Sequence, residues 1–102
     1  MNSEERKQRP MFEALFKYFP DALMEISHHS WKANEKHNPG EPVYWNRDKS
    51  TDEKDALLRH MIDLAKGEEY DEDGFRTATA VAWRSLAMLQ KELEADRDVS
   101  KL

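Results

Sequence analysis

The sequence predicts an all-α protein, a small bundle of three to four helices. Apolar residues recur at three- and four-residue spacings in four separate stretches, as amphipathic helices require. No stretch alternates apolar and polar residues in the way that half-buried strands do. A chain of 102 residues has the length of one domain. We therefore expect one helical domain over residues 11–95, between a flexible arm (1–10) and a frayed tail (96–102).

Two helices are predicted before the middle of the chain. The first spans residues 11–19, because Phe12, Leu15, Phe16 and Phe19 form a single apolar face. Pro20 interrupts it and suits the first position of a second helix, which is predicted to end at about residue 37.

The buried face of the second helix becomes polar at its end. An apolar face that includes Leu23, Ile26 and Trp31 continues into Asn34, His37 and Asn38. Burying polar groups is costly unless they find partners, so this change indicates a ligand site. A loop rich in proline and glycine, residues 38–50, follows and is predicted to cover that site.

The loop itself has two interpretations. Its aromatic residues Tyr44 and Trp45 precede the cations Arg47 and Lys49. This arrangement could receive a nucleobase and its phosphates. Alternatively, the two aromatic side chains simply cover the helix bundle.

A third helix is predicted from a Ser50–Glu53 capping box to about Lys66, with Gly67 ending it. Asp55 and Arg59, one turn apart, are either a surface ion pair or part of a site. His60 lies on the opposite margin. The predicted buried arc consists of Leu57, Leu58, Met61, Ile62, Leu64 and Ala65.

Residues 68–74 carry five carboxylates. Such a segment either binds a hard cation such as Mg²⁺ or Mn²⁺ or is a solvated turn leading into the next helix. The fourth helix is predicted from Asp73 to Ala95. It carries two apolar stripes, of which one can face the core and the other a partner chain: Phe75, Ala78, Ala82, Leu86, Leu89 and Leu93 in the first, Val81 and Met88 in the second.

Composition limits the classes of function. Apolar residues make up only 38% of the chain and charged residues 36%, so shared burial in a homo-oligomer is expected. A net charge of −5 argues against binding a nucleic acid polymer. No apolar run reaches transmembrane length, and cysteine is absent, so we expect no membrane association and a cytoplasmic location.

Several common catalytic motifs are missing. The chain has no glycine-rich phosphate loop, no cysteine nucleophile and no serine in a nucleophile elbow. Carboxylates acting with a metal ion, helped by histidine, are the remaining means of catalysis.

Four segments together resemble a known family. They are the run from Asn34 to Ser50 (NEKHNPGEPVYWNRDKS), Asp55 to His60, Asp71 to Gly74, and Ala82-Trp83. Over roughly residues 20–94 the chain is similar to the N-terminal domain of dATP/dGTP diphosphohydrolases. That family occurs mostly in phages and prophages and is related to the all-α MazG-like nucleotide pyrophosphatases.

The resemblance implies hydrolysis of a purine deoxynucleoside triphosphate to the monophosphate and pyrophosphate, with Mg²⁺ or Mn²⁺, in the cytoplasm of the host cell. From their chemistry we predict Glu35, Asp55 and His60 as catalytic residues and Glu35, Asp55 and Asp71 as metal ligands. The predicted substrate-binding residues are Asn34, His37, Asn38, Trp45, Arg47, Lys49 and Arg59. Many relatives carry histidines just after the Asp-Gly segment, where this chain has Arg76, Thr77 and Ala80.

Three hypotheses follow. The chain is a metal-dependent nucleotide pyrophosphohydrolase, a nucleotide-binding protein that sequesters its ligand without hydrolysis, or a helical module that binds a host protein. The missing histidines favour the second hypothesis over the first. The stripe of Val81 and Met88 favours the third, and the polar end of the second helix argues against it.

Overall fold

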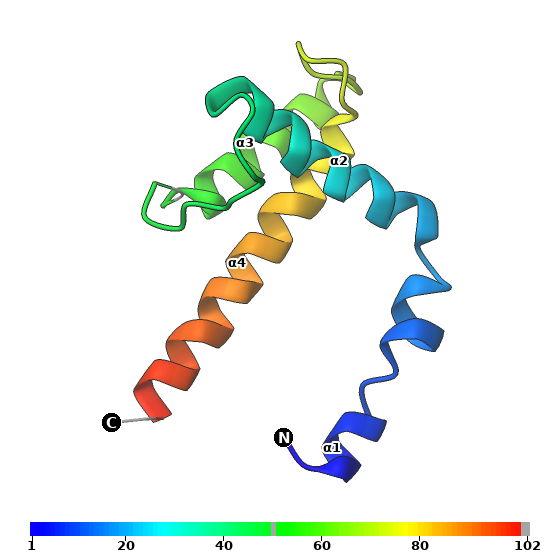
Figure 1. The fold of residues 1–102 in the computed structure, drawn as a ribbon. Helices are drawn as coiled ribbons and strands as arrows, with labels where there is room; N and C mark the ends of the chain where they lie inside the picture. The colour runs from blue at the N-terminus through cyan, green and yellow to red at the C-terminus, as the bar shows by residue number, and fades with distance from the viewer. Residues whose placement is uncertain (50, 101–102) are drawn as a thin grey trace.

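The computed structural model describes residues 1–49 and 51–100, with side chains as far as Arg97, and its regular structure is helical (Figure 1). The elements are α1 (Ser3–Lys7), a π-helix η1 (Phe12–Phe16), α2 (Pro20–His37), α3 (Glu53–Ala65) and α4 (Thr77–Ser100). Over these described ranges no strand forms, and Tyr70 and Arg76 make an isolated antiparallel bridge. The prediction of an all-α fold is confirmed.

The long helix α4 is the centre of the bundle, and α2 and α3 both pack on it (Figure 1). Helix α2 begins with Pro20 at its first turn and ends at His37, as predicted. Proline fits this position because the first helical N–H groups have no partner within the helix.

Small side chains make the contact between α3 and α4. Ala80 and Ala87, two turns apart on α4, are buried, and so is Ala56 on α3. Short side chains let the two helix backbones approach closely. Among residues with described side chains, Phe75 is the one large apolar residue that is buried.

A buried carboxylate fixes this packing. Glu53, at the start of α3, is 6% exposed and accepts a hydrogen bond from Lys91 Nζ of α4 at 3.0 Å. The guanidinium of Arg84 lies 3.9 Å from its other oxygen. Two cations from α4 therefore compensate the burial of one anion from α3.

The apolar arc predicted for α3 is only partly correct. Leu57 and Leu64 are half-buried, but Leu58, Met61 and Ile62 are exposed. Helix α3 packs on α4 through the side that carries Ala56, so its apolar arc is wider than the surface that this contact covers.

The C-terminal half of the larger stripe is likewise uncovered. Its members Leu86, Leu89 and Leu93 are each about half-exposed, whereas Val81 and Met88 of the smaller stripe are half-buried. Val81 and Met88 are thus partly covered within the protomer, and their contact with a partner chain stays a prediction. Those residues lie next to the alanine side of α4 that receives α3, and the leucines point elsewhere.

Helix α4 begins later and ends later than predicted. It starts at Thr77 instead of Asp73 because Gly74 has φ of +82°, which a right-handed helix cannot contain. It ends at Ser100 instead of Ala95, so it continues into the segment expected to fray.

The N-terminal region contains two short helices, of which only the second was predicted from the sequence. Asn2 caps the short helix α1 within the predicted arm by accepting a hydrogen bond from the Glu5 N–H at 2.9 Å. Residues 12–16 are a π-helix instead of an α-helix. The flexibility of the arm and the domain boundaries stay predictions. Ser50 of the predicted Ser50–Glu53 capping box lies outside the described residues, and Asp52 occupies the N-cap position of α3.

None of the described helices is both long enough and apolar enough to cross a membrane.

Candidate functional site

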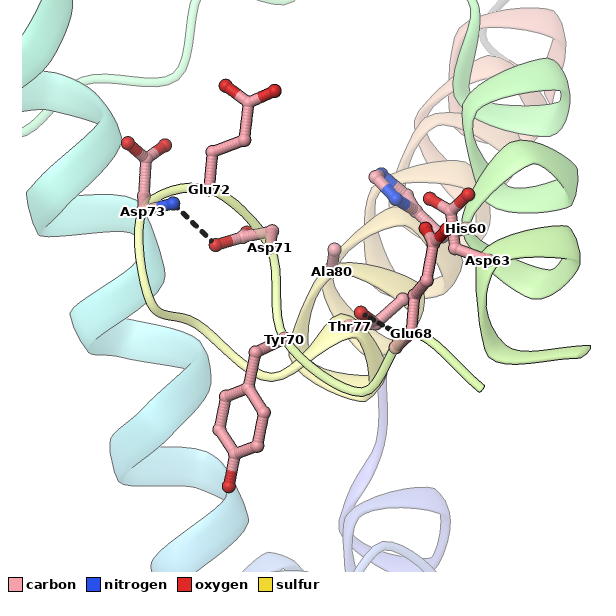
Figure 2. Close-up of a pocket in the computed structure, with 9 residues that line it drawn as sticks. All are labelled: His60, Asp63, Glu68, Tyr70, Asp71, Glu72, Asp73, Thr77 and Ala80. Carbon is pink, nitrogen blue, oxygen red and sulfur yellow. Dashed lines mark hydrogen bonds between the residues drawn. The ribbon is translucent and has the colours of Figure 1, made fainter. Parts of the chain in front are cut away.

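An acidic cavity of about 320 Å³ lies where α3, the segment after it and the start of α4 meet (Figure 2). Its lining contains five carboxylates, one imidazole, one phenol, one hydroxyl and one methyl group, supplied by Asp63, Glu68, Asp71, Glu72, Asp73, His60, Tyr70, Thr77 and Ala80. We call it the acidic cavity.

The turn that carries the carboxylates is held by hydrogen bonds. Oδ1 of Asp71 accepts from the backbone N–H groups of Asp73 and Phe75, each at 2.9 Å. The Asp71 N–H donates to the Phe75 carbonyl oxygen at 2.8 Å, which closes the turn. Thr77 Oγ1 donates to the Glu68 carbonyl oxygen at 2.7 Å and ties the start of the turn to α4.

Carboxylates and imidazole line two sides of the cavity. His60, Asp63 and Glu68 lie on one side, and Asp71, Glu72 and Asp73 on the other (Figure 2). Oxygen donors suit Mg²⁺ or Mn²⁺, and an imidazole suits Mn²⁺ better. The donor types therefore fit a divalent cation. In their present positions, no three such side chains of the described residues converge closely enough to hold one ion together.

Asp71 is the member of this set best placed to serve a metal ion. One of its oxygens holds the turn, which orients the carboxylate and leaves Oδ2 to bind a cation. Hydrogen bonds to one oxygen of a ligating carboxylate are a common way of fixing its direction.

A second imidazole, that of His29 on α2, lies close enough to the acidic turn for the charge of Asp71 to influence it. Burial lowers its pKa, an effect that the charge of Asp71 opposes and that Arg84 and His60 reinforce. Its ring packs edge-on against Phe75, with ring centroids 5.2 Å apart. Its Nδ1 is buried and neither donates nor accepts a hydrogen bond. His29 is thus a neutral imidazole with an unused ring nitrogen beside the acidic turn.

Two lysines of α2 approach the acidic turn from outside. Lys32 Nζ donates to the carbonyl oxygen of Asp73 at 2.6 Å, and Lys36 Nζ lies 3.5 Å from the carboxylate of Asp73. These cations partly offset the negative charge of the turn and stand at its edge.

The predicted loop residues Trp45 and Arg47 bind to α4. Arg47 Nε donates to Glu94 at 2.8 Å and lies over the Trp45 ring at 4.3 Å, and the hydrogen bond lowers the pKa of Glu94. Trp45 packs edge-on against Trp83, with centroids 5.7 Å apart. Trp45 therefore covers the bundle, whereas Tyr44 is 74% exposed and does not.

Of the three polar residues predicted to share a buried face at the end of α2, one is buried and two are exposed. Asn34 is buried, and its Nδ2 donates to the Glu41 carbonyl oxygen at 2.9 Å, which holds the loop on the helix. His37 and Asn38 are exposed, as is Lys49 in the loop. The three polar residues thus do not share one buried site.

The remaining predicted residues are spread over the surface. Arg59 pairs with Asp52 at 3.0 Å, which lowers the pKa of Asp52, so the expected pairing with Asp55 is wrong. Asp55 lines a second cavity, of about 390 Å³, near the start of α3. Glu35 is half-buried on α2 and lines neither cavity.

The structure therefore brings together only His60 and Asp71 of the predicted catalytic and metal-binding residues. Glu35 and Asp55, predicted with them, lie elsewhere. Asp63 was not predicted, although its place three residues after His60 puts both on one helix face. His29 was not predicted, because it adjoins His28 and two neighbouring side chains point about 100° apart on a helix, which disfavours a shared metal ion.

Taken together, the fold and the cavity define an all-α protein with a carboxylate-lined cavity. The family model for "dATP/dGTP diphosphohydrolase, N-terminal" matches residues 2–100, and the chain belongs to that family. The match is longer than the predicted resemblance, which covered roughly residues 20–94. Searches of curated proteins and of solved structures gave no match.

Proposed function

We propose that this protein is a metal-dependent nucleotide pyrophosphohydrolase that converts dGTP or dATP to the monophosphate and pyrophosphate. The observation that carries the proposal is the acidic cavity, in a chain that matches a family named for this reaction over residues 2–100. We also propose a role in the nucleotide pool of a phage-infected host cell, which the resemblance to that family implies.

Charge is the reason to expect dependence on a metal ion. Five carboxylates line the cavity, and a triphosphate is itself an anion. The two would repel each other unless a divalent cation stood between them. Mg²⁺ or Mn²⁺ held by Asp71 with Asp63 or Glu68 would supply that charge and polarise a phosphate.

The chain's own residues can share the remaining tasks. His60 lines the cavity and can accept a proton from the attacking water. Lys32 and Lys36, which contact Asp73, would release it to contact phosphate oxygens. Arg47 and Arg59, predicted for this role, are paired with Glu94 and Asp52, which do not line the acidic cavity.

A product assay tests the proposal. Purified protein is incubated with each dNTP and with Mg²⁺ or Mn²⁺, and pyrophosphate and dNMP are measured separately. We expect metal-dependent release of both from dGTP or dATP. Asp71→Asn should lower the rate at least about tenfold, because the amide keeps the turn's acceptor but loses the charge.

Glu25→Gln is the matched control, since it removes one negative charge from an exposed position of α2 outside the acidic cavity. Its rate should equal that of the wild type. An equal loss in both variants would contradict a site at the cavity. A rise in melting temperature with nucleotide but no product would favour the binding protein that sequesters its ligand.

A further inference from the structure

The acidic cavity has a phenol ring in its lining, that of Tyr70, the residue before Asp71. Figure 2 shows the Tyr70 side chain pointing away from the carboxylates of the lining. The residue is 55% exposed, so much of the ring is accessible to a ligand. In the proposed function the carboxylates hold the metal ion with the phosphates beside it, and the ring lies outside that region.

Backbone pairing sets the position of this ring. Tyr70 and Arg76 face each other in an isolated antiparallel bridge. The next residues inward are joined by a hydrogen bond of 2.8 Å from the Asp71 N–H to the Phe75 carbonyl oxygen. Side chains that lie directly opposite each other in an antiparallel pair project from the same face. The turn therefore makes the side chains of Tyr70 and Arg76 neighbours.

The guanidinium of Arg76 covers one face of the Tyr70 ring. Its carbon lies 5.1 Å from the ring centroid, within the range of a cation–π contact. Among residues with described side chains, no carboxylate forms an ion pair with Arg76. Arg47, Arg59 and Arg84 each have such a partner. The guanidinium thus supports one face of the ring, and the exposed surface of the ring is left for a ligand.

The size of the cavity places a nucleobase outside the carboxylate cluster. The volume of about 320 Å³ is at the lower end of the range for ligand pockets, roughly 300–1,000 Å³. A metal ion and the phosphate chain fill much of that space. The sugar and the base must therefore extend past the carboxylates, and Tyr70 is the flat apolar surface that the lining offers there.

We propose that Tyr70 is the stacking platform for the base of the nucleotide and that Arg76 is its positioning residue. Proteins hold bases by stacking them on aromatic rings and on arginine. A purine has two fused rings and overlaps a phenol more fully than a pyrimidine does, so this platform favours purine nucleotides. The inference rests on the proposed function, because it takes the phosphates to bind at the acidic cavity.

Trp45, predicted to bind the substrate, is less suited to this role. It does not line the acidic cavity, and its ring packs edge-on against Trp83 and under the guanidinium of Arg47. Tyr70 belongs to the same kind of aromatic–arginine pair but presents it at the cavity. The location of the pair, and not its composition, distinguishes Tyr70.

Nucleoside monophosphates measure recognition of the base without turnover. In titration calorimetry with Mg²⁺, the wild type should bind dGMP more tightly than dCMP. Tyr70→Leu should weaken dGMP binding at least about fivefold, the lower end of what removal of a stacking ring costs. Tyr70→Phe keeps the ring and should keep the affinity. Tyr18→Leu makes the same change at an exposed tyrosine before α2 and should have no effect.

A double variant tests the positioning role of Arg76. Arg76→Gln should weaken dGMP binding about two- to fivefold, as expected for loss of an exposed cation–π contact. In the Tyr70→Leu background the same change should have no further effect, because the ring on which it acts is gone. Equal losses in the two backgrounds would overturn the positioning role, since Arg76 would then act independently of the ring.

Inorganic triphosphate separates this proposal from the proposed function, because it has the phosphates but no base. Its Mg²⁺-dependent binding should be unchanged in Tyr70→Leu and weakened in Asp71→Asn. Binding of neither triphosphate nor dGMP by the wild type would overturn the proposed function and this proposal together.

Two results would overturn the platform alone. The first is intact triphosphate binding with equal dGMP affinity in Tyr70→Leu and the wild type. The second is a loss of dGMP affinity in Tyr44→Leu that Tyr70→Leu does not show, which would place the base on the loop over residues 38–50.

Discussion

The carboxylate of Asp71 serves the fold and, in the proposed function, also the chemistry. Its Oδ1 accepts two backbone N–H groups, and its charge faces the acidic cavity. The substitution Asp71→Asn separates the two roles, because the amide oxygen can still accept the hydrogen bonds but carries no charge.

We predict that Asp71→Ala lowers the free energy of unfolding by about 1–2 kcal/mol, because two backbone donors lose their partner. Asp71→Asn should cost much less, since its Oδ1 still accepts. Urea unfolding of both variants checks this. Equal losses would mean that the charge, and not the acceptor, holds the turn.

His29 makes stability depend on pH. Because burial lowers its folded pKa, the unfolded chain binds a proton more readily than the folded chain. Stability should therefore be complete above the unfolded pKa, about 6.5, and should fall as the pH drops below that value. Asp52 and Glu94, whose pKa values are also lowered, act only in the carboxylate range further down.

The expected observation is a lower unfolding free energy at pH 5.5 than at pH 7.5 for the wild type. His29→Gln should reduce that difference, because glutamine does not titrate. His37→Gln, at an exposed position of the same helix, is the matched control and should retain it. An unchanged pH dependence in His29→Gln would exclude His29 as its source.

At the scale of the helices, alanine determines which surfaces meet. Ala80 and Ala87 of α4 and Ala56 of α3 lie in the contact, and the leucines of α4 do not. The ion pairs of Glu53 with Lys91 and Arg84 lie on the same side of α4. A buried carboxylate with two cations and a row of small residues thus fixes one register of the two helices.

We expect Ala87→Leu to destabilise the protein by about 1–3 kcal/mol, because the larger side chain must push α3 away. Ala95→Leu makes the same change at an exposed position of α4 and should have an effect below about 0.5 kcal/mol. Chemical denaturation measures both. A well-tolerated Ala87→Leu would contradict close packing between the two helices.

At the scale of the whole molecule, the apolar surface left exposed is the dominant feature. The described residues bury few large apolar side chains. Exposed ones include three phenylalanines before α2 and three leucines of α4, namely Phe12, Phe16, Phe19, Leu86, Leu89 and Leu93. The homo-oligomer expected from the composition would cover such side chains, so its folding and association should be linked.

This linkage predicts that the melting temperature rises with protein concentration. A tenfold dilution should lower it for the wild type, since dissociation accompanies unfolding. Calorimetry over a hundredfold range of concentration checks this, and a constant wild-type melting temperature would argue against an oligomer that folds and associates together.

The sequence by itself determined the helices, because their spacing of apolar residues and their proline and glycine boundaries are local properties. It placed α2 at residues 20–37 and identified the carboxylates after α3 as candidates for a cation. It also showed that the chain has too few apolar residues for a large core.

Only the tertiary structure decided which surfaces and side chains meet. Periodicity shows that Leu89 and Ala87 lie on different faces of α4, but not which face receives α3. Spacing along the chain could not reveal that His60 and Asp71 share a cavity while Asp55 lies apart, or that Glu94 holds Arg47. Helix packing sets these juxtapositions through contacts between residues distant in sequence, which no local pattern encodes.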